Sequence, residues 1–203
     1  MQKVGTIAFP EFKGLKINMM PFIQGDPTSL PDELQGYADI IENNFIEKGE
    51  IGFLTIDESF VQANTSQRGY NSHDANRNIH IEVGYNANSK AKWGNTSWRG
   101  EGFVTLEENT QVLIANSMDD TCRVWDKLMK VNTPDGDLSH LLEEFPESSG
   151  RLMKAGELFK ISIFTPHECV PQNKNSNRQF FRIVGKGVKG RESYFTENPL
   201  VTV

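Results

Sequence analysis

From residue 50 onward the sequence consists of short apolar, β-branched and aromatic runs that are separated by clusters of Gly, Asn, Asp, Ser and Pro. This pattern is typical of strands joined by turns. We expect a mainly β fold of seven or eight short strands, arranged as a sandwich or barrel, and a jelly roll is the leading arrangement because it hides strand edges. The predicted strands are Ile51–Gln62, Asn78–Tyr85, Gly102–Leu106, Gln111–Ala115, Arg123–Val131, Glu157–Thr165 and Gln179–Val184.

The best helix signal lies between residues 21 and 50, where apolar residues recur at helical spacing before Gly49. We expect one helix near 31–47 that packs on the sheet through Leu34, Tyr37, Ile41 and Phe45. A second short helix is predicted over 137–145, where Asp137 can cap the first turn and three leucines make an apolar face.

The chain of 203 residues predicts one domain, in which a segment at 1–49 packs on a β core at 50–190. Its apolar runs are far shorter than the roughly 20 residues of a membrane span. The N-terminus lacks the apolar region of a secretory signal, so we expect a cytoplasmic protein with two free thiols, Cys122 and Cys169. With 21 Lys+Arg against 27 Asp+Glu and no basic stripe, a small-molecule partner is favoured over nucleic acid or a membrane.

Two of the four histidines suggest a metal site. His80 and Glu82 lie two residues apart on the predicted strand Asn78–Tyr85, so both side chains point to one face, about 6.6 Å apart along the strand, whereas Ile79 and Ile81 point to the other. An imidazole and a carboxylate presented together are two thirds of the 2-His-1-carboxylate triad that binds Fe(II). His167, which follows another predicted strand, supplies the third ligand.

The order His80-x-Glu82, then His167, then Arg178 eleven residues later resembles the H-x-[DE]…H…R order of the Fe(II)/2-oxoglutarate-dependent dioxygenases. The resemblance covers roughly residues 78–184 and implies a double-stranded β-helix, also found in cupins, with Fe(II) or another divalent transition metal bound by the three ligands. It also implies that Arg178 pairs with the far carboxylate of 2-oxoglutarate, a task that suits the planar guanidinium. Arg182 has the same strand parity and is the alternative anion-binding residue.

Four aromatic or charged residues are candidates for a substrate pocket, because two predicted loops, 63–78 and 84–102, bracket the strand of His80 and because Arg123 and Trp125 share a strand face. The candidates are Tyr85, Trp98, Arg123 and Trp125. His73 is expected to be satisfied or solvated, and His140 is expected to be structural. Three functions stay open: a 2-oxoglutarate-dependent oxygenase, a cupin-like metal protein with other chemistry, and a jelly-roll binding module without a metal.

Overall fold

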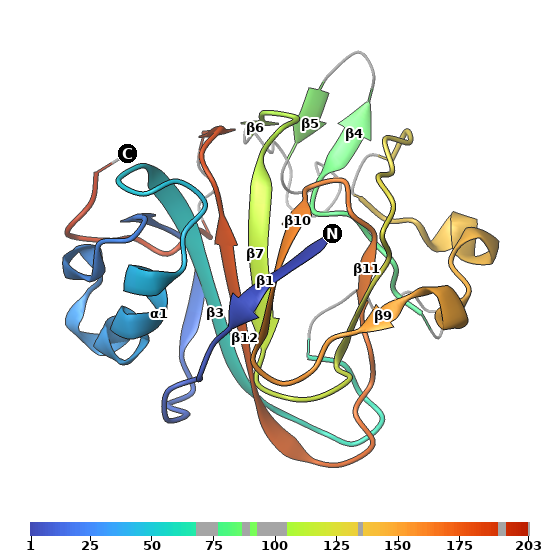
Figure 1. Ribbon diagram of the computed structural model, residues 1–203, viewed down its shortest axis with the longest axis horizontal. Helices are drawn as coiled ribbons and strands as arrows, with labels where there is room; N and C mark the ends of the chain where they lie inside the picture. The colour runs from blue at the N-terminus through green and yellow to red at the C-terminus, as the bar shows by residue number, and fades with distance from the viewer. Residues whose placement is uncertain (68–76, 87–89, 93–104, 134–135, 191–193, 203) are drawn as a thin grey trace.

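The computed structural model describes residues 1–67, 77–86, 90–92, 105–133, 136–190 and 194–202, which form three antiparallel sheets (Figure 1). The large sheet has the order β1 (Gln2–Thr6), β10 (Glu157–Ser162), β7 (Gln111–Asn116), β12 (Ser176–Val184), β3 (Ile51–Val61), β2 (Lys16–Ile23). The small sheet is β11 (His167–Cys169), β8 (Cys122–Val124), β9 (Arg151–Leu152). The third is β13 (Val188–Lys189), β6 (Thr105–Leu106), β5 (Lys90–Lys92), β4 (Gly84–Asn86).

The helical elements are short. They are η1 (Pro27–Ser29), η2 (Asp32–Tyr37), α1 (Ala38–Asn43), η3 (Ser139–Glu144) and η4 (Glu147–Ser149). The first three lie on the outer side of the large sheet, and the last two lie beyond the small sheet (Figure 1). Within the described part of the chain, no helix is long and apolar enough to cross a membrane. The prediction of a mainly β fold is therefore confirmed.

Strands from the two halves of the chain pair in nested order. The first strand of the core, β3, pairs with β12, which is the last strand of the large sheet along the chain, β7 pairs with β10, and β8 pairs with β9. The segment around His80 pairs with β11 through a bridge between His80 and His167. Contacts of β12 with β7 and of β11 with β8 then join these pairs into two sheets.

Several predicted boundaries differ from the structure. The strand predicted over Arg123–Val131 ends at Val124, because the N–H of Lys127 turns back to the carbonyl of Trp125 at 2.8 Å. The strand predicted over Gly102–Leu106 is seen as β6 only, since 102–104 lie outside the described residues. The helix predicted over 137–145 is a 3₁₀ segment, η3, although Asp137 does accept a hydrogen bond from the N–H of Ser139 at 2.8 Å.

The N-terminal segment covers the outer face of the large sheet. Leu34, Tyr37 and Ile41 are buried there as predicted, and the ring of Tyr37 stacks on Phe181 with centroids 6.2 Å apart. The prediction for Phe45 is wrong, since this side chain is 39% exposed. The helix ends at Asn43, because the next residue adopts an extended backbone, so Phe45 lies beyond the helical face.

A buried carboxylate fastens this segment to the sheet. Glu58 on β3 accepts hydrogen bonds from the backbone N–H groups of Lys13 and Leu15, at 2.6 and 3.1 Å. It also accepts them from the Tyr37 hydroxyl at 2.8 Å and from the Gln179 amide at 3.0 Å. Burial acts to raise the pKa of Glu58, but the hydrogen bonds to its charged form outweigh burial and lower that pKa below its ordinary value.

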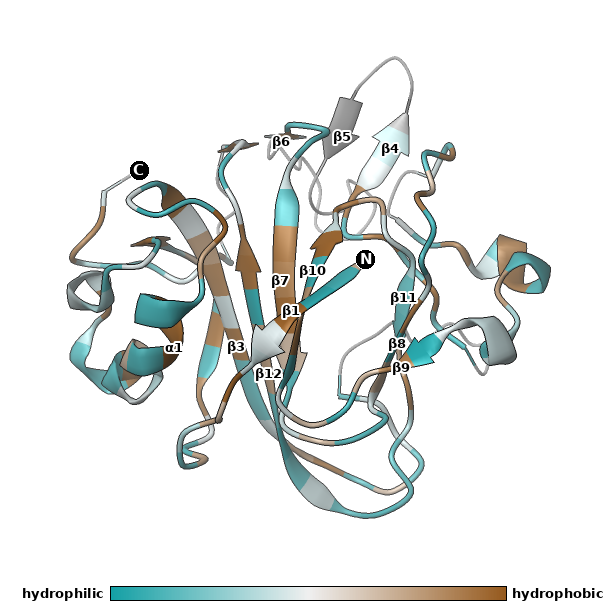
Figure 2. Cartoon of the chain, viewed as in Figure 1, coloured by the Kyte–Doolittle hydropathy of each residue, from teal (hydrophilic) through white to brown (hydrophobic). Residues whose placement is uncertain are grey.

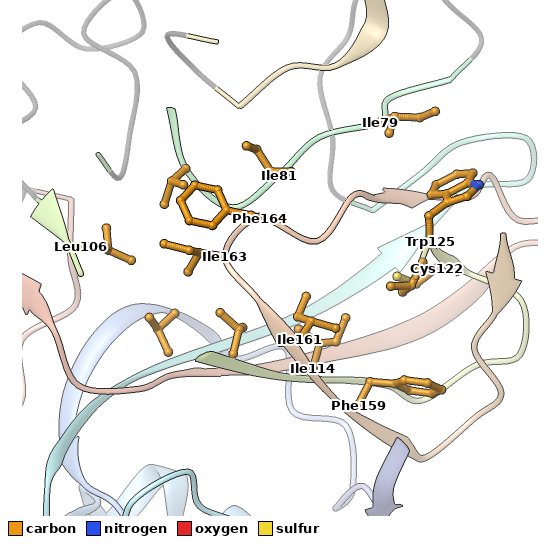
Figure 3. Close-up of a cluster of buried hydrophobic side chains, with 14 of the residues drawn as sticks. Ile79, Ile81, Leu106, Ile114, Cys122, Trp125, Phe159, Ile161, Ile163 and Phe164 are labelled. Carbon is orange, nitrogen blue, oxygen red and sulfur yellow. The ribbon is translucent and has the colours of Figure 1, made fainter. Parts of the chain in front are cut away.

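A hydrophobic cluster joins the large sheet, the small sheet and the segment around His80. Ile79, Ile81 and Val83 belong to this cluster, in agreement with the alternation read from the sequence, and Figure 3 shows the first two. Figure 2 shows that β7, in the middle of the large sheet, is hydrophobic over most of its length, whereas β1 at the edge is mainly hydrophilic. Polar side chains that are buried in the strands around this cluster therefore need a hydrogen-bond partner or another specific reason for their burial.

Candidate metal and anion site

Two imidazoles lie side by side on paired backbone segments. His80 and His167 exchange backbone N–H···O hydrogen bonds of 2.9 Å in both directions, and their ring centroids are 4.3 Å apart. The Nδ1 atom of His80 lies 3.0 Å from the carbonyl oxygen of Asn78, and Nδ1 of His167 lies 2.9 Å from that of Thr165. Because a carbonyl only accepts, each Nδ1 carries the proton, and in the neutral ring the lone pair is on Nε2.

Glu82 lies next to these rings and takes part in a buried ion pair. Its Oε1 is 3.5 Å from Nε2 of His167, and its Oε2 is 2.8 Å from Nη1 of Arg182. The side chains of Glu82 and Arg182 are only 4% and 6% exposed, and Arg182 also donates to the Thr55 hydroxyl at 3.1 Å. The structure thus brings His80, Glu82 and His167 together, with Arg182 on the far side of the carboxylate.

In the ranges that the structure describes, no three His, Cys, Asp or Glu side chains have their donor atoms arranged to hold a metal ion. The carboxylate of Glu82 is held by Arg182. The three predicted ligands match the donor types of a metal site, since both Nε2 atoms carry the lone pair in the neutral rings and the Glu82 carboxylate lies 3.5 Å from Nε2 of His167.

Arg178 lies on the same strand as Arg182 and is fully buried, with no negative partner among the described residues. Its Nη2 donates to the side chain of Asn116 and, at 3.2 Å, to the carbonyl of Thr121. Its Nε and Nη1 have no hydrogen-bond partner, and no ion pair in the described residues includes it. The alternation of β12 puts it on the same face as Arg182, about 13 Å away along the strand. A buried cation without a negative partner destabilises the folded protein unless an anion binds next to it.

Arg123 and Trp125 make their side-chain contacts away from His80, Glu82 and His167. Arg123 is opposite Glu168 in the small sheet and pairs with it and, at 2.8 Å, with Glu147. His167 and Glu168 are adjacent in β11, so their side chains point to opposite faces. Trp125 packs edge-on against Phe145, at 5.6 Å between centroids. The sequence correctly puts the two residues on one face, but it is the face turned away from His167.

The other predicted site residues have different positions. The Tyr85 ring packs edge-on against Phe164, at 5.3 Å between centroids, as part of the hydrophobic cluster. Trp98 and His73 lie outside the described residues, as do most of the loops predicted at 63–78 and 84–102. His140, expected to be structural, is exposed.

Sequence reasoning missed Asn116 and Thr55, which hold the two arginines, because neutral polar residues in apolar strands carry no motif. It also left the two cysteines without a partner, whereas the structure puts Cys122 and Cys169 opposite each other on β8 and β11, both as free thiols. Burial, and then the neighbouring Cys169, raise the pKa of the Cys122 thiol above its ordinary range.

Comparison with protein-family models, with curated proteins and with solved structures finds no match.

Proposed function

We propose that residues 50–190 form a double-stranded β-helix, that is, a jelly roll. A jelly roll arises when a long antiparallel hairpin of eight strands is rolled up, so that strand 1 pairs with 8, 2 with 7, 3 with 6 and 4 with 5. The nested pairing of β3 with β12, of the His80 segment with β11, of β7 with β10 and of β8 with β9 supports this arrangement. It puts His80 and His167 on strands 2 and 7, which are neighbours.

We propose further that His80, Glu82 and His167 hold a divalent transition ion, with Fe(II) preferred. The support is chemical. Both Nδ1 atoms are engaged by backbone carbonyls, which is the arrangement that orients imidazole ligands toward a metal through Nε2, and a carboxylate completes a 2-His-1-carboxylate set. Fe(II) in such a set supplies oxygen activation at its open positions.

The proposed cosubstrate is inferred from Arg178, since its buried guanidinium has unused hydrogen-bond donors and no counter-ion in the described residues. A carboxylate of 2-oxoglutarate provides that counter-ion and accepts two parallel hydrogen bonds from it. Arg182 is the weaker anion-binding candidate, because Glu82 already neutralises it. We therefore propose a non-haem Fe(II) oxygenase that depends on 2-oxoglutarate and acts on a small molecule, with Arg178 binding the cosubstrate.

The Arg182–Glu82 ion pair favours one other function, a jelly-roll module that binds an anion at Arg178 and takes no metal. A cupin-like metal protein with other chemistry is the third possibility, and it gives Arg178 no role.

Metal content separates these functions. Equilibrium dialysis of the purified chain against Mn(II) or Fe(II) under nitrogen should give one ion per chain, and His80→Ala should abolish binding. His140→Ala is the matched control, because this histidine is exposed, and it should bind like the unmodified protein. With Fe(II) and oxygen, the unmodified protein should convert 2-oxoglutarate to succinate. Absence of metal binding would favour the binding module, and metal binding without succinate would favour the cupin-like protein.

A further inference from the structure

The two cysteines occupy a cross-strand position that suits a disulfide. In the pairing of β11 with β8, Cys169 is opposite Cys122. The N–H of Val170 bonds to the carbonyl of Thr121, and the N–H of Trp125 bonds to that of Pro166, both at 3.0 Å. Hydrogen-bonded and non-hydrogen-bonded pairs alternate along an antiparallel ladder, so the cysteine pair, one step from Thr121–Val170, is a non-hydrogen-bonded one.

Non-hydrogen-bonded pairs bring the Cα atoms to about 4.5 Å and point both side chains to the same face. Disulfides occur at Cα separations of about 4.4–6.8 Å. The backbone of β8 and β11 therefore already has the separation and the side-chain direction that a bridge requires, at the short end of the permitted range.

The two thiols differ in access. Cys122 is 3% exposed, whereas Cys169 is partly exposed. Because Cys169 is the more exposed of the two, a small reagent reaches it first, and Cys122 is the second thiol.

We propose that Cys122 and Cys169 are a site of reversible disulfide formation, with a small-molecule disulfide such as oxidised glutathione as the oxidant. The Cys169 sulfur attacks one sulfur of the reagent, forming a mixed disulfide and releasing one thiol. The Cys122 sulfur then attacks Cys169, forming the intrachain bond and releasing the second thiol. The two protein thiols are oxidised, the reagent disulfide is reduced to two thiols, and each departing sulfur takes up the proton given up by the attacking thiol.

The bridge would tie β8 to β11 two residues from His167, so the oxidation state of the pair acts on the strand that carries this histidine. Formation of this disulfide depends only on the register of β8 with β11 and on the exposure of Cys169 to the reagent. It does not require a metal or 2-oxoglutarate, and it can fail or hold independently of the proposed function.

The test is equilibration of the native, full chain with oxidised and reduced glutathione, followed by acid quench, alkylation of free thiols and peptide mapping by mass spectrometry. The expected product is a peptide pair linked through Cys122 and Cys169, with the chain lighter by the two hydrogens lost, and reversible by dithiothreitol. Closure should be at least about tenfold faster in the native protein than in concentrated urea, because the fold holds the thiols together. Two alkylated thiols after native equilibration, or a bridge between two chains, would overturn the proposal.

Two variants test the order of attack. Cys122→Ala should retain one glutathione on Cys169, because no second thiol displaces it. Cys169→Ala should stay unmodified while folded, because Cys122 is buried. Equal modification of both variants would contradict the assignment of Cys169 as the thiol that reacts first. If a variant does not fold, peptide mapping of the chain without substitutions still tests whether the disulfide forms.

Discussion

Replacing Arg182 by methionine should destabilise the metal-free protein and make its stability depend on a divalent ion. Arg182 holds the Glu82 carboxylate at 2.8 Å, and both side chains are almost fully buried. Removing one partner of a buried ion pair leaves an uncompensated charge, at a cost of about 3–5 kcal/mol. An ion bound by the carboxylate restores compensation, and a ligand at 100 times its dissociation constant adds about 2.7 kcal/mol of stability.

The assay is urea unfolding followed by tryptophan fluorescence, with EDTA or with Mn(II). Arg182→Met should lose roughly 3–5 kcal/mol in EDTA and regain most of the loss in Mn(II). It should also bind Mn(II) more tightly than the unmodified protein, because the guanidinium no longer competes for the carboxylate. Glu82→Gln is the matched control, which should be destabilised under both conditions. Equal stability of Arg182→Met in EDTA and in Mn(II) would refute a role for Glu82 as a metal ligand.

Two further substitutions test the anchoring of the N-terminal segment by Glu58 and the close packing of Gly136 against Ile81. Glu58→Gln should lower the free energy of unfolding by about 1.5–3 kcal/mol at pH 7, since a charge-assisted hydrogen bond is lost. Because the pKa of Glu58 is lowered in the folded state, the carboxylate contributes its full stability above the unfolded pKa of about 4.3, and this contribution is lost as the pH falls through the folded pKa. Acid unfolding of the variant should therefore depend less on pH. An unchanged pH dependence would contradict this. Gly136→Ala should lower the thermal midpoint and weaken the proposed metal binding, because Gly136 has a φ of +84° and an added Cβ would lie 2.5 Å from the carbonyl oxygen of Ile81, which lies between His80 and Glu82. Gly14→Ala, with a φ of +77° and open space around its Cβ, is the control that isolates the backbone effect, and equal losses in the two variants would rule out the contact.

Local patterns could be predicted from the sequence because they depend on neighbours in the chain. The period of two in a strand predicts His80 and Glu82 on one face, and the structure has both beside His167, although the predicted strand Asn78–Tyr85 is present only as an isolated bridge at His80 and as the start of β4. Alternation alone does not say which face of a strand is the inner one. Arg123 and Trp125 could therefore be predicted to share a face, but not that Arg123 pairs with Glu168 on the face opposite to His167.

Long-range register could not be read from the sequence. The opposition of Cys122 and Cys169 depends on how β8 aligns with β11, across more than forty residues of intervening chain. The two arginines of β12 likewise have equal strand parity, and only the structure distinguishes them, since Glu82 neutralises Arg182 and leaves Arg178 without a negative partner in the described residues.

The most direct test of the central claim is calorimetric titration of the Mn(II)-loaded protein with 2-oxoglutarate, in the absence of oxygen. The unmodified protein should bind one molecule. Arg178→Lys keeps the charge but loses the planar fork, so affinity should fall by about ten- to a hundredfold, equivalent to roughly 1.5–3 kcal/mol, while Mn(II) binding survives. Arg151→Lys, at a half-exposed position paired with Glu157, should bind normally. No binding by the unmodified protein, or equal affinity of Arg178→Lys, would contradict the assignment.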